Sequence, residues 1–185
     1  MVGSRWAVRW TDKYALSDGP PHPPWAMALM PDIFPVGEPV DGRPAFAAKL
    51  VLKSRALLIE PAAYLKTLLD EFRARGGVLV QRDVHEVAEL RALQEPVVVN
   101  CTGLGARALF GDEGLQPAKG QLVMLPPQPE VDYMLHAEGG LYMASRADGV
   151  VLGGSWQLDD DTMEPDPEET RRIVDGHRAI FSRMP

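Results

Sequence analysis

The chain has 185 residues, enough for one domain with a hydrophobic core, and its 45% hydrophobic and 24% charged residues are typical of a globular protein. A net charge of −7 argues against a nucleic-acid partner, which favours a basic surface, and no apolar run is long enough to span a membrane. A single cysteine, Cys101, cannot form an internal disulfide and fits a reducing compartment such as the cytoplasm.

The first 45 residues combine many prolines with scattered aromatic residues, among them Trp6, Trp10, Trp25 and Phe34. Proline removes a backbone donor and restricts the residue before it. This stretch therefore predicts little regular structure and an extended surface segment. A solvated linker would contain fewer tryptophans, so we expect these aromatic side chains to pack on another surface.

The middle of the chain predicts alternating helices and strands. Apolar residues recur every three or four positions after Pro61, which suits a first helical position, and Gly76-Gly77 ends this pattern. Further patterns predict strands at 46–52, 56–59, 78–80 and 97–99, a helical segment at 84–93 and a short helix at 106–110.

The last third of the chain predicts an antiparallel sheet followed by a helix. Asp148-Gly149 is a hairpin signal, and Asp166-Pro167 opens a helix that runs toward Phe181. The expected strands lie at 121–125, 133–135, 141–145 and 150–153. The whole pattern predicts a mixed α/β (α+β) fold.

The most informative segment is the expected buried strand at 97–99, which continues into Asn100, Cys101, Thr102 and Gly103. Ligands bind at the carboxyl ends of strands in open α/β sheets, and small residues there let a nucleotide approach the backbone. The same pattern is equally typical of a strand that simply ends in a glycine turn. No G-x-G-x-x-G motif is present to decide between these interpretations.

Several separate segments within 59–154 resemble, in order and spacing, the D-amino-acid oxidase family of FAD-dependent oxidoreductases. The matching pieces are Glu60, Tyr64-Leu65, Gly76-Gly77, Gln81-Arg82-Asp83-Val84, Val99-Asn100-Cys101-Thr102-Gly103, Leu115-Gln116-Pro117, Gly120-Gln121, Tyr142, Leu152-Gly153-Gly154 and Gln157-Leu158. The resemblance implies FAD as cofactor. It also implies that a backbone position at Val84 and the side chain of Thr102 contact the adenosine part of FAD, with Cys101 and Gly103 as neighbours.

Tyr142 matches a family tyrosine whose hydroxyl helps to hold the substrate carboxylate, because its spacing to Leu152-Gly153-Gly154 is the same. A second tyrosine that many family members carry just upstream is absent, since 137–140 occupies its place. Without the resemblance, Tyr142 would be interpreted as an ordinary strand tyrosine. Arg146 is a further candidate for binding an acidic substrate, although a surface arginine at a strand end is the simpler interpretation.

The resemblance implies oxidation of a small amine or D-amino acid, with hydride transfer to the flavin and then oxygen reduction to hydrogen peroxide; a homodimer is also conceivable on this basis. It divides the chain into residues 1–55 and 119–185 of a substrate domain and residues 56–118 of an FAD-binding domain. The family's glycine-rich pyrophosphate turn would precede this sequence, and its carboxylate-binding arginine would follow it. We therefore expect a central fragment. The alternative is a non-catalytic truncated module that acts through a partner chain.

Overall fold

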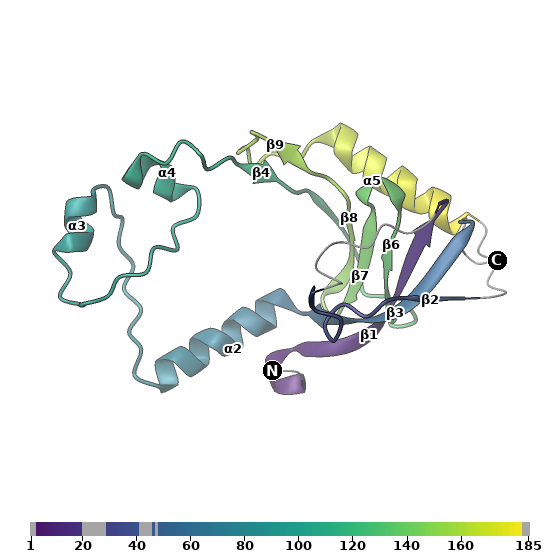
Figure 1. Cartoon of the computed structure of the whole chain (residues 1–185), viewed down its shortest axis with the longest axis horizontal. Helices are drawn as coiled ribbons and strands as arrows, with labels where there is room; N and C mark the ends of the chain where they lie inside the picture. Colours follow the sequence, from purple (N-terminus) through teal and green to yellow (C-terminus); the bar gives the residue numbers. More distant parts are fainter. Residues whose placement is uncertain (1–2, 20–28, 41–45, 47, 183–185) are drawn as a thin grey trace.

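The computed structural model describes residues 3–19, 29–40, 46 and 48–182. Its main element is a seven-stranded sheet in the order β2-β3-β1-β6-β7-β8-β5 (Figure 1). The strands are β1 Val8–Ser17, β2 Glu38–Pro39, β3 Leu50–Ile59, β5 Leu122–Leu125, β6 Tyr133–His136, β7 Tyr142–Arg146 and β8 Gly149–Gly153. A separate two-stranded sheet pairs β4 Ala118–Lys119 with β9 Gln157–Leu158.

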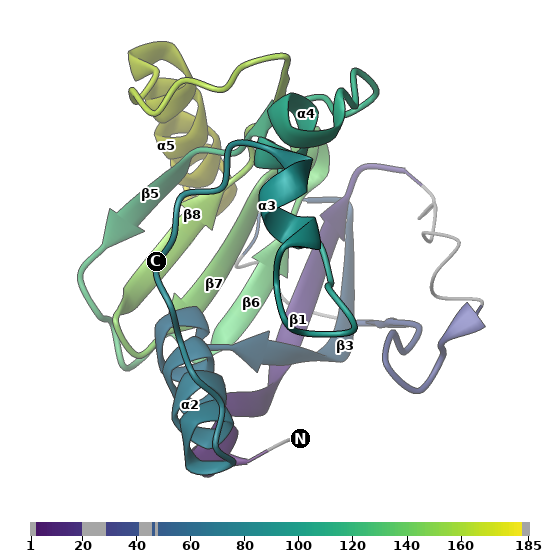
Figure 2. The ribbon, with the colours of Figure 1, turned by 90° about the vertical axis from the view of Figure 1, so that its left-hand side faces the viewer.

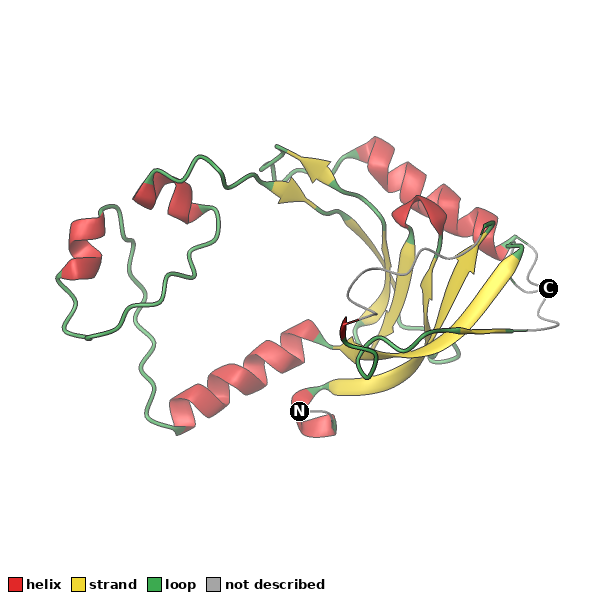
Figure 3. Ribbon diagram, viewed as in Figure 1, coloured by secondary structure: helices red, strands yellow, loops and turns green. Residues whose placement is uncertain are grey.

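The helices lie on both sides of the seven-stranded sheet (Figures 1 and 2). Helix α5 covers one face, and helices α2, α3 and α4 lie on the opposite side (Figure 2). The helices are α2 Pro61–Ala74, α3 Val87–Arg91, α4 Gly105–Phe110 and α5 Pro167–Phe181, and the 3-10 turns are η1 Ser4–Trp6 and η2 Glu138–Gly140 (Figure 3).

The prediction of little regular structure in the first 45 residues is wrong for strand β1. This ten-residue strand pairs with β3 along its full length and with β6 in parallel, so it lies inside the sheet. The physical reason is local, because no proline precedes Pro20 and residues 8–17 can donate a complete ladder of hydrogen bonds. The prolines at 20–24 and Trp25 lie outside the described residues, whereas Trp6 packs against Tyr64 of α2 with ring centroids 6.5 Å apart.

The end of the strand predicted at 46–52 and the strand predicted at 56–59 form one strand, β3, which begins only at Leu50. The intervening polar residues Lys53 to Arg55 do not interrupt it, because each has a partner opposite in β1. The helix predicted after Pro61 is confirmed as α2, and Gly76 adopts a positive φ of 88° just after its end. Glu60 precedes this helix and accepts hydrogen bonds from the backbone N–H of Ala147 at 3.1 and 3.2 Å.

The predicted C-terminal strands and the last helix are confirmed as β5, β6, β7, β8 and α5, and β7 and β8 form the predicted antiparallel hairpin. Asp166 caps α5 by accepting hydrogen bonds from the N–H groups of Glu168 and Glu169. One pairing differs from the prediction, because β6 joins β1 in parallel. The sheet is therefore mixed.

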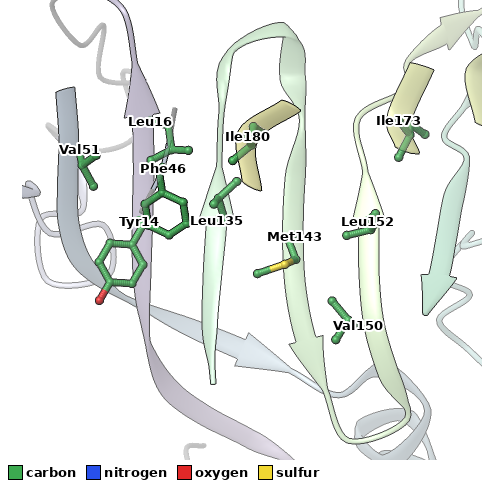
Figure 4. Packing of buried hydrophobic residues seen from close by; sticks show 10 residues of the cluster. All are labelled: Tyr14, Leu16, Phe46, Val51, Leu135, Met143, Val150, Leu152, Ile173 and Ile180. Atoms are coloured by element: carbon green, nitrogen blue, oxygen red, sulfur yellow. The ribbon is translucent and has the colours of Figure 1, made fainter. Parts of the chain in front are cut away.

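The hydrophobic core lies between α5 and one face of the sheet. Its buried side chains alternate along the strands and meet Ile173 and Ile180 of the helix, as Figure 4 shows. The cluster comprises Tyr14, Leu16, Phe46, Val51, Leu135, Met143, Val150, Leu152, Ile173 and Ile180. Residues one position away from these on the same strands therefore point to the opposite face.

The buried strands predicted at 78–80 and 97–99 are wrong. Both segments are coil, and Val78, Val80, Val97 and Val99 expose 74–78% of their surface. A buried strand needs neighbours on both edges, and the described part of the chain places none beside these segments. The helix predicted at 84–93 shortens to α3, whereas the short helix at 106–110 is confirmed as α4.

The predicted mixed α/β fold class is confirmed. Strands from residues 1–55 and 119–185 share the main sheet, while β3 crosses the predicted boundary at residue 55. The division into a substrate domain and an FAD-binding domain stays a prediction. Within the described ranges, no helix is both long and apolar enough to cross a membrane.

Candidate functional site

The sheet face opposite α5 carries Tyr142, the residue predicted to bind the substrate carboxylate. Strand register pairs Tyr142 with His136 of β6 on one side and with Gly153 of β8 on the other. Met143, the next residue of β7, points into the core beneath α5, so Tyr142 points away from the core. A smaller apolar cluster of Leu58, Ala144 and Val151 supports Tyr142 on this face.

Gly153 shapes the position of the Tyr142 side chain. A Cβ atom at Gly153 would stand 2.5 Å from the Tyr142 hydroxyl oxygen and closer still to two ring carbons. The phenol ring therefore lies across the β8 backbone in space that only glycine leaves free. Tyr142 is half-buried in this position, and its hydroxyl group lies over the neighbouring strand.

His177 of α5 holds the backbone of Tyr142 from the core side. The His177 side chain is 3% exposed; its Nε2 lies 3.1 Å from the Tyr142 carbonyl oxygen and its Nδ1 lies 2.7 Å from the Ile173 carbonyl oxygen. Both oxygens are acceptors, and a neutral imidazole has one N–H, so the tautomer that carries it on Nε2 donates to the Tyr142 carbonyl oxygen and links the helix to β7. Arg172 of the same helix donates to the carbonyl oxygen of Gly154, just after β8.

Arg146 is engaged within the protein. Its guanidinium forms two hydrogen bonds with the Asp148 carboxylate, Nε to Oδ1 at 2.8 Å and Nη2 to Oδ2 at 2.5 Å. These hydrogen bonds, and then the charges of Asp148 and Glu60, raise the pKa of Arg146 above its ordinary value. The simpler interpretation of Arg146, a surface arginine at the end of a strand, fits this geometry better than a substrate contact.

Thr102 and Gly103 lie in an open turn before α4. The Asn100 side-chain oxygen accepts from the Thr102 N–H at 3.1 Å and from the Thr102 hydroxyl at 2.8 Å. Gly103 has φ +56°, and a Cβ atom built there meets nothing within 4 Å. The Thr102 hydroxyl oxygen keeps its acceptor capacity, because its proton is directed at Asn100.

The other two predicted flavin contacts lie on the same excursion of the chain, between α2 and β4. Val84 is half-buried in the coil before α3, and Cys101 is exposed beside Thr102. Cys101 is exposed because the strand predicted at 97–99, which would have buried it, does not form. Tyr142 lies in β7, and its side chain points away from the core beneath α5. Helices α3 and α4 lie on that other side of the sheet (Figure 2).

The exposed turn fits the adenosine part of FAD. It combines an open glycine, an acceptor hydroxyl and the exposed apolar surface of Val97 and Val99, which suits a flat heterocycle and a ribose. The pyrophosphate is different, because it requires a glycine-rich turn at a helix N-terminus, and the sequence contains no G-x-G-x-x-G motif. The chain therefore offers residues for one end of the cofactor.

Two residues of this site escaped sequence reasoning. His177 lies in the helical pattern of α5, where nothing in the sequence indicates contact with β7. Gly153 was recognised only as part of a motif, although a glycine inside an apolar strand is a sign that another group approaches the backbone closely. That sign, combined with the hairpin register, could have placed Gly153 opposite Tyr142.

Comparison with known proteins shows the family to which the chain belongs. The family model described as FAD dependent oxidoreductase matches residues 6–184. The D-amino-acid oxidase of Streptomyces coelicolor is 34% identical over 157 residues, which cover 81% of this chain and 45% of that protein. The D-aspartate oxidase of Homo sapiens is 34% identical over 119 residues, covering 64% of this chain and 34% of that protein.

Among solved structures, glycine oxidase from Geobacillus kaustophilus superposes with a TM-score of 0.69 at 14% identity, covering 95% of this chain and 55% of that chain. This likeness shows the fold. The chain spans less than half the length of the curated relatives that it matches. FAD, the cofactor implied by the sequence resemblance, is the cofactor that the family model names. Since that model matches nearly the whole sequence, the chain belongs to the family of FAD-dependent oxidoreductases.

Proposed function

We propose that this chain provides the substrate-binding wall of an enzyme that oxidises a D-amino acid or a related small amine with FAD. Family membership supports the cofactor, and the names of the relatives, D-amino-acid oxidase and D-aspartate oxidase, support the substrate class. The observation that carries the proposal is the Tyr142 phenol, fixed across Gly153 on the sheet face opposite α5.

Tyr142 has a binding role in this proposal. Its hydroxyl donates a hydrogen bond to the substrate carboxylate, while Gly153 and His177 fix the ring and the backbone that carry it. A hydrogen bond to a charged group contributes about 1.5–3 kcal/mol. Because 1.4 kcal/mol changes an equilibrium constant about tenfold, this contact alone is worth roughly tenfold to a hundredfold in substrate affinity.

The excursion between α2 and β4 has the cofactor-binding role. The backbone at Val84 and the Thr102 hydroxyl contact the adenosine part, with Cys101 and Gly103 beside them. When bound, FAD would accept the α-hydrogen of the substrate as a hydride, which leaves an imino acid for water to hydrolyse, and would then pass the two electrons to oxygen to give hydrogen peroxide. Ala144 and Val151 give the substrate wall an apolar floor that limits water there.

The test is Tyr142→Phe in the full-length product of the gene, loaded with FAD and assayed with D-alanine, D-aspartate and glycine. We expect KM to rise at least about tenfold with the fold unchanged by circular dichroism, because one charge-assisted hydrogen bond is lost. Tyr64→Phe is the matched control, since Tyr64 of α2 packs against Trp6 rather than against Gly153. Unchanged KM and kcat in Tyr142→Phe contradict the role of Tyr142.

A second function, a non-catalytic module that pairs with a partner chain, is favoured by one observation. Val78, Val80, Val97 and Val99 expose apolar surface that a partner could cover. Light scattering and turnover separate the two functions. A stable complex without turnover of any amino acid after FAD loading favours the module, and flavin-dependent turnover excludes it.

A further inference from the structure

Lys13 of β1 lies on the same sheet face as Tyr142. Its neighbour Tyr14 points into the core, 5% exposed, so Lys13 points to the opposite face. Parallel register places Lys13 beside Met134, and Ala15 beside His136, which in turn pairs with Tyr142. Lys13 therefore lies two strands from Tyr142, in a register row that is two residues farther along the strands.

The Lys13 ammonium has no counterion within the described ranges of the chain, where it makes neither a hydrogen bond nor an ion pair. The other two cations of this face, Arg146 and Arg9, are engaged with Asp148 and with the Ser145 carbonyl oxygen, respectively. Lys13 is half-buried, and a partly desolvated charge without a partner costs free energy that a bound anion would recover.

The groups around Lys13 support the conclusion that its charge is partly buried and has no partner. Burial lowers the pKa of Lys13 from its ordinary value, and no carboxylate opposes that shift. His136 keeps an exposed edge, yet neighbouring atoms remove part of its water; this desolvation, and then the charge of Lys13, lower the pKa of His136. The two basic groups are thus close enough to interact, and His136 lies next to Tyr142 on the adjacent strand.

An apolar strip separates Lys13 from Tyr142. Met134 and Ala144 pair across β6 and β7 in the register row of Lys13, two residues along the strands from the row of Tyr142. Adjacent strands lie about 4.8 Å apart, so β1 and β7 are about 10 Å apart. The Tyr142 hydroxyl lies over β8, so the extended Lys13 side chain reaches back across β6 for one small molecule to contact both groups. The strip suits the short methylene chain of a small substrate.

We infer that Lys13 binds the side-chain carboxylate of the substrate while Tyr142 binds the α-carboxylate, so that the preferred substrate is a dicarboxylic D-amino acid. This inference rests on the proposed function, because it adds a second contact to the same bound molecule. The protein therefore prefers D-aspartate or D-glutamate to their amides, which are close in size and shape but lack the second negative charge.

The first experiment compares kcat/KM for D-aspartate and D-asparagine in the FAD-loaded, full-length product of the gene. The wild-type protein prefers D-aspartate at least about tenfold, as one charge-assisted hydrogen bond predicts. Lys13→Met abolishes this preference mainly through the KM for D-aspartate and changes the values for D-asparagine less than about twofold. Lys13→Arg keeps most of the preference because it keeps the charge.

The second experiment measures binding without turnover. Succinate, a dicarboxylate with no amine to oxidise, raises the melting temperature of the 185-residue chain, and Lys13→Met removes that shift. Lys66→Met is the control for the loss of one positive charge, because Lys66 lies on α2 with 75% of its side chain exposed and pairs with Asp70. That variant keeps the succinate shift.

The outcomes separate this inference from the proposed function. Turnover of neutral D-amino acids with no preference for D-aspartate overturns the role of Lys13 and leaves the proposed function intact. Equal losses for D-aspartate and D-asparagine in Lys13→Met also overturn it, because Lys13 would then hold a group that both substrates share. No turnover of any amino acid contradicts the proposed function, and the succinate shift then decides the role of Lys13 alone.

Discussion

The phenol ring of Tyr142 lies across the backbone of Gly153, its partner on the adjacent strand β8. The two residues belong to one hairpin, β7–β8, whose turn follows Arg146. The position of the hydroxyl group therefore depends on a residue without a side chain. Tyr142 can act as a substrate contact only while the space over Gly153 stays free.

Gly153→Ala is expected to displace the Tyr142 ring and to destabilise the protein. Overpacking of this kind costs about 1–3 kcal/mol, so the free energy of unfolding in urea falls by that amount, and the KM for the substrate rises as the hydroxyl moves. Gly120→Ala is the matched control, since a Cβ atom there meets only the Ser155 carbonyl oxygen at 3.9 Å. If Gly153→Ala leaves both stability and KM unchanged, the Tyr142 ring does not depend on the space over Gly153, and this account of the contact is wrong.

His177→Leu is expected to loosen the link between α5 and β7. The variant removes the buried imidazole that faces the carbonyl oxygens of Tyr142 and Ile173. Leaving a buried acceptor without its partner costs about 1–3 kcal/mol, which urea denaturation would measure. His85→Leu, on the exposed coil before α3, is the control and should unfold as the wild type does. Equal stability of the two variants would contradict the anchoring role.

Asp160 makes the stability of the region around β4 and β9 depend on pH. Hydrogen bonds from the Thr162 hydroxyl and N–H, and from Lys119 at 3.0 Å, lower the pKa of Asp160 to about 2. Because the folded-state pKa lies below the unfolded value, Asp160 stabilises the fold fully above about pH 4 and loses this contribution as the pH falls toward 2.

The measurement is thermal unfolding between pH 7 and pH 2. Asp160→Asn is expected to lower the melting temperature at pH 7 and to flatten its decline in acid, whereas Asp161→Asn, exposed beside it, keeps the wild-type profile. Identical acid profiles in the Asp160→Asn variant and the wild type would refute the contribution of Asp160.

FAD binding is expected to protect the exposed excursion from hydrogen exchange. Backbone amides near Val84 and Thr102 lie in exposed coil or short turns, so they exchange quickly in the free chain. Added FAD slows exchange at 82–86 and 98–104, while amides of β7, already protected by the sheet, change little. Protection confined to the sheet, with no change at Thr102, would count against the predicted cofactor contacts.

Much of the fold could be predicted from the sequence where local patterns decide structure. Three such patterns each depend only on residues that are close in the sequence: the helical period after Pro61, the Asp148-Gly149 turn and the Asp166 cap. The helices and the hairpin that they predict are present. Strand β1 was not predicted, because prolines are frequent between residues 20 and 44 and the first 45 residues were interpreted as one segment. Residues 1–19 themselves contain no proline, so nothing there prevents a strand.

The wrong strands at 78–80 and 97–99 have a different cause. Runs of valine predict buried strands, but burial depends on long-range partners that no local pattern reveals. The site shows the same limit. Tyr142 could be proposed from the family resemblance, through its spacing to Leu152-Gly153-Gly154, whereas the orientation of Lys13 required the register of β1 against β6. Cross-strand contacts of this kind follow from topology rather than from the neighbouring sequence.

The central claim is that a D-amino acid reduces FAD at the face that carries Tyr142, and flavin absorbance tests it most directly. The full-length product of the gene, loaded with FAD, freed of excess cofactor and made anaerobic, would be mixed with D-aspartate or L-aspartate. The account predicts that the yellow absorbance persists with L-aspartate, bleaches with D-aspartate, and bleaches much more slowly in Tyr142→Phe at low substrate concentration. Retained flavin that no D-amino acid or small amine bleaches would contradict it.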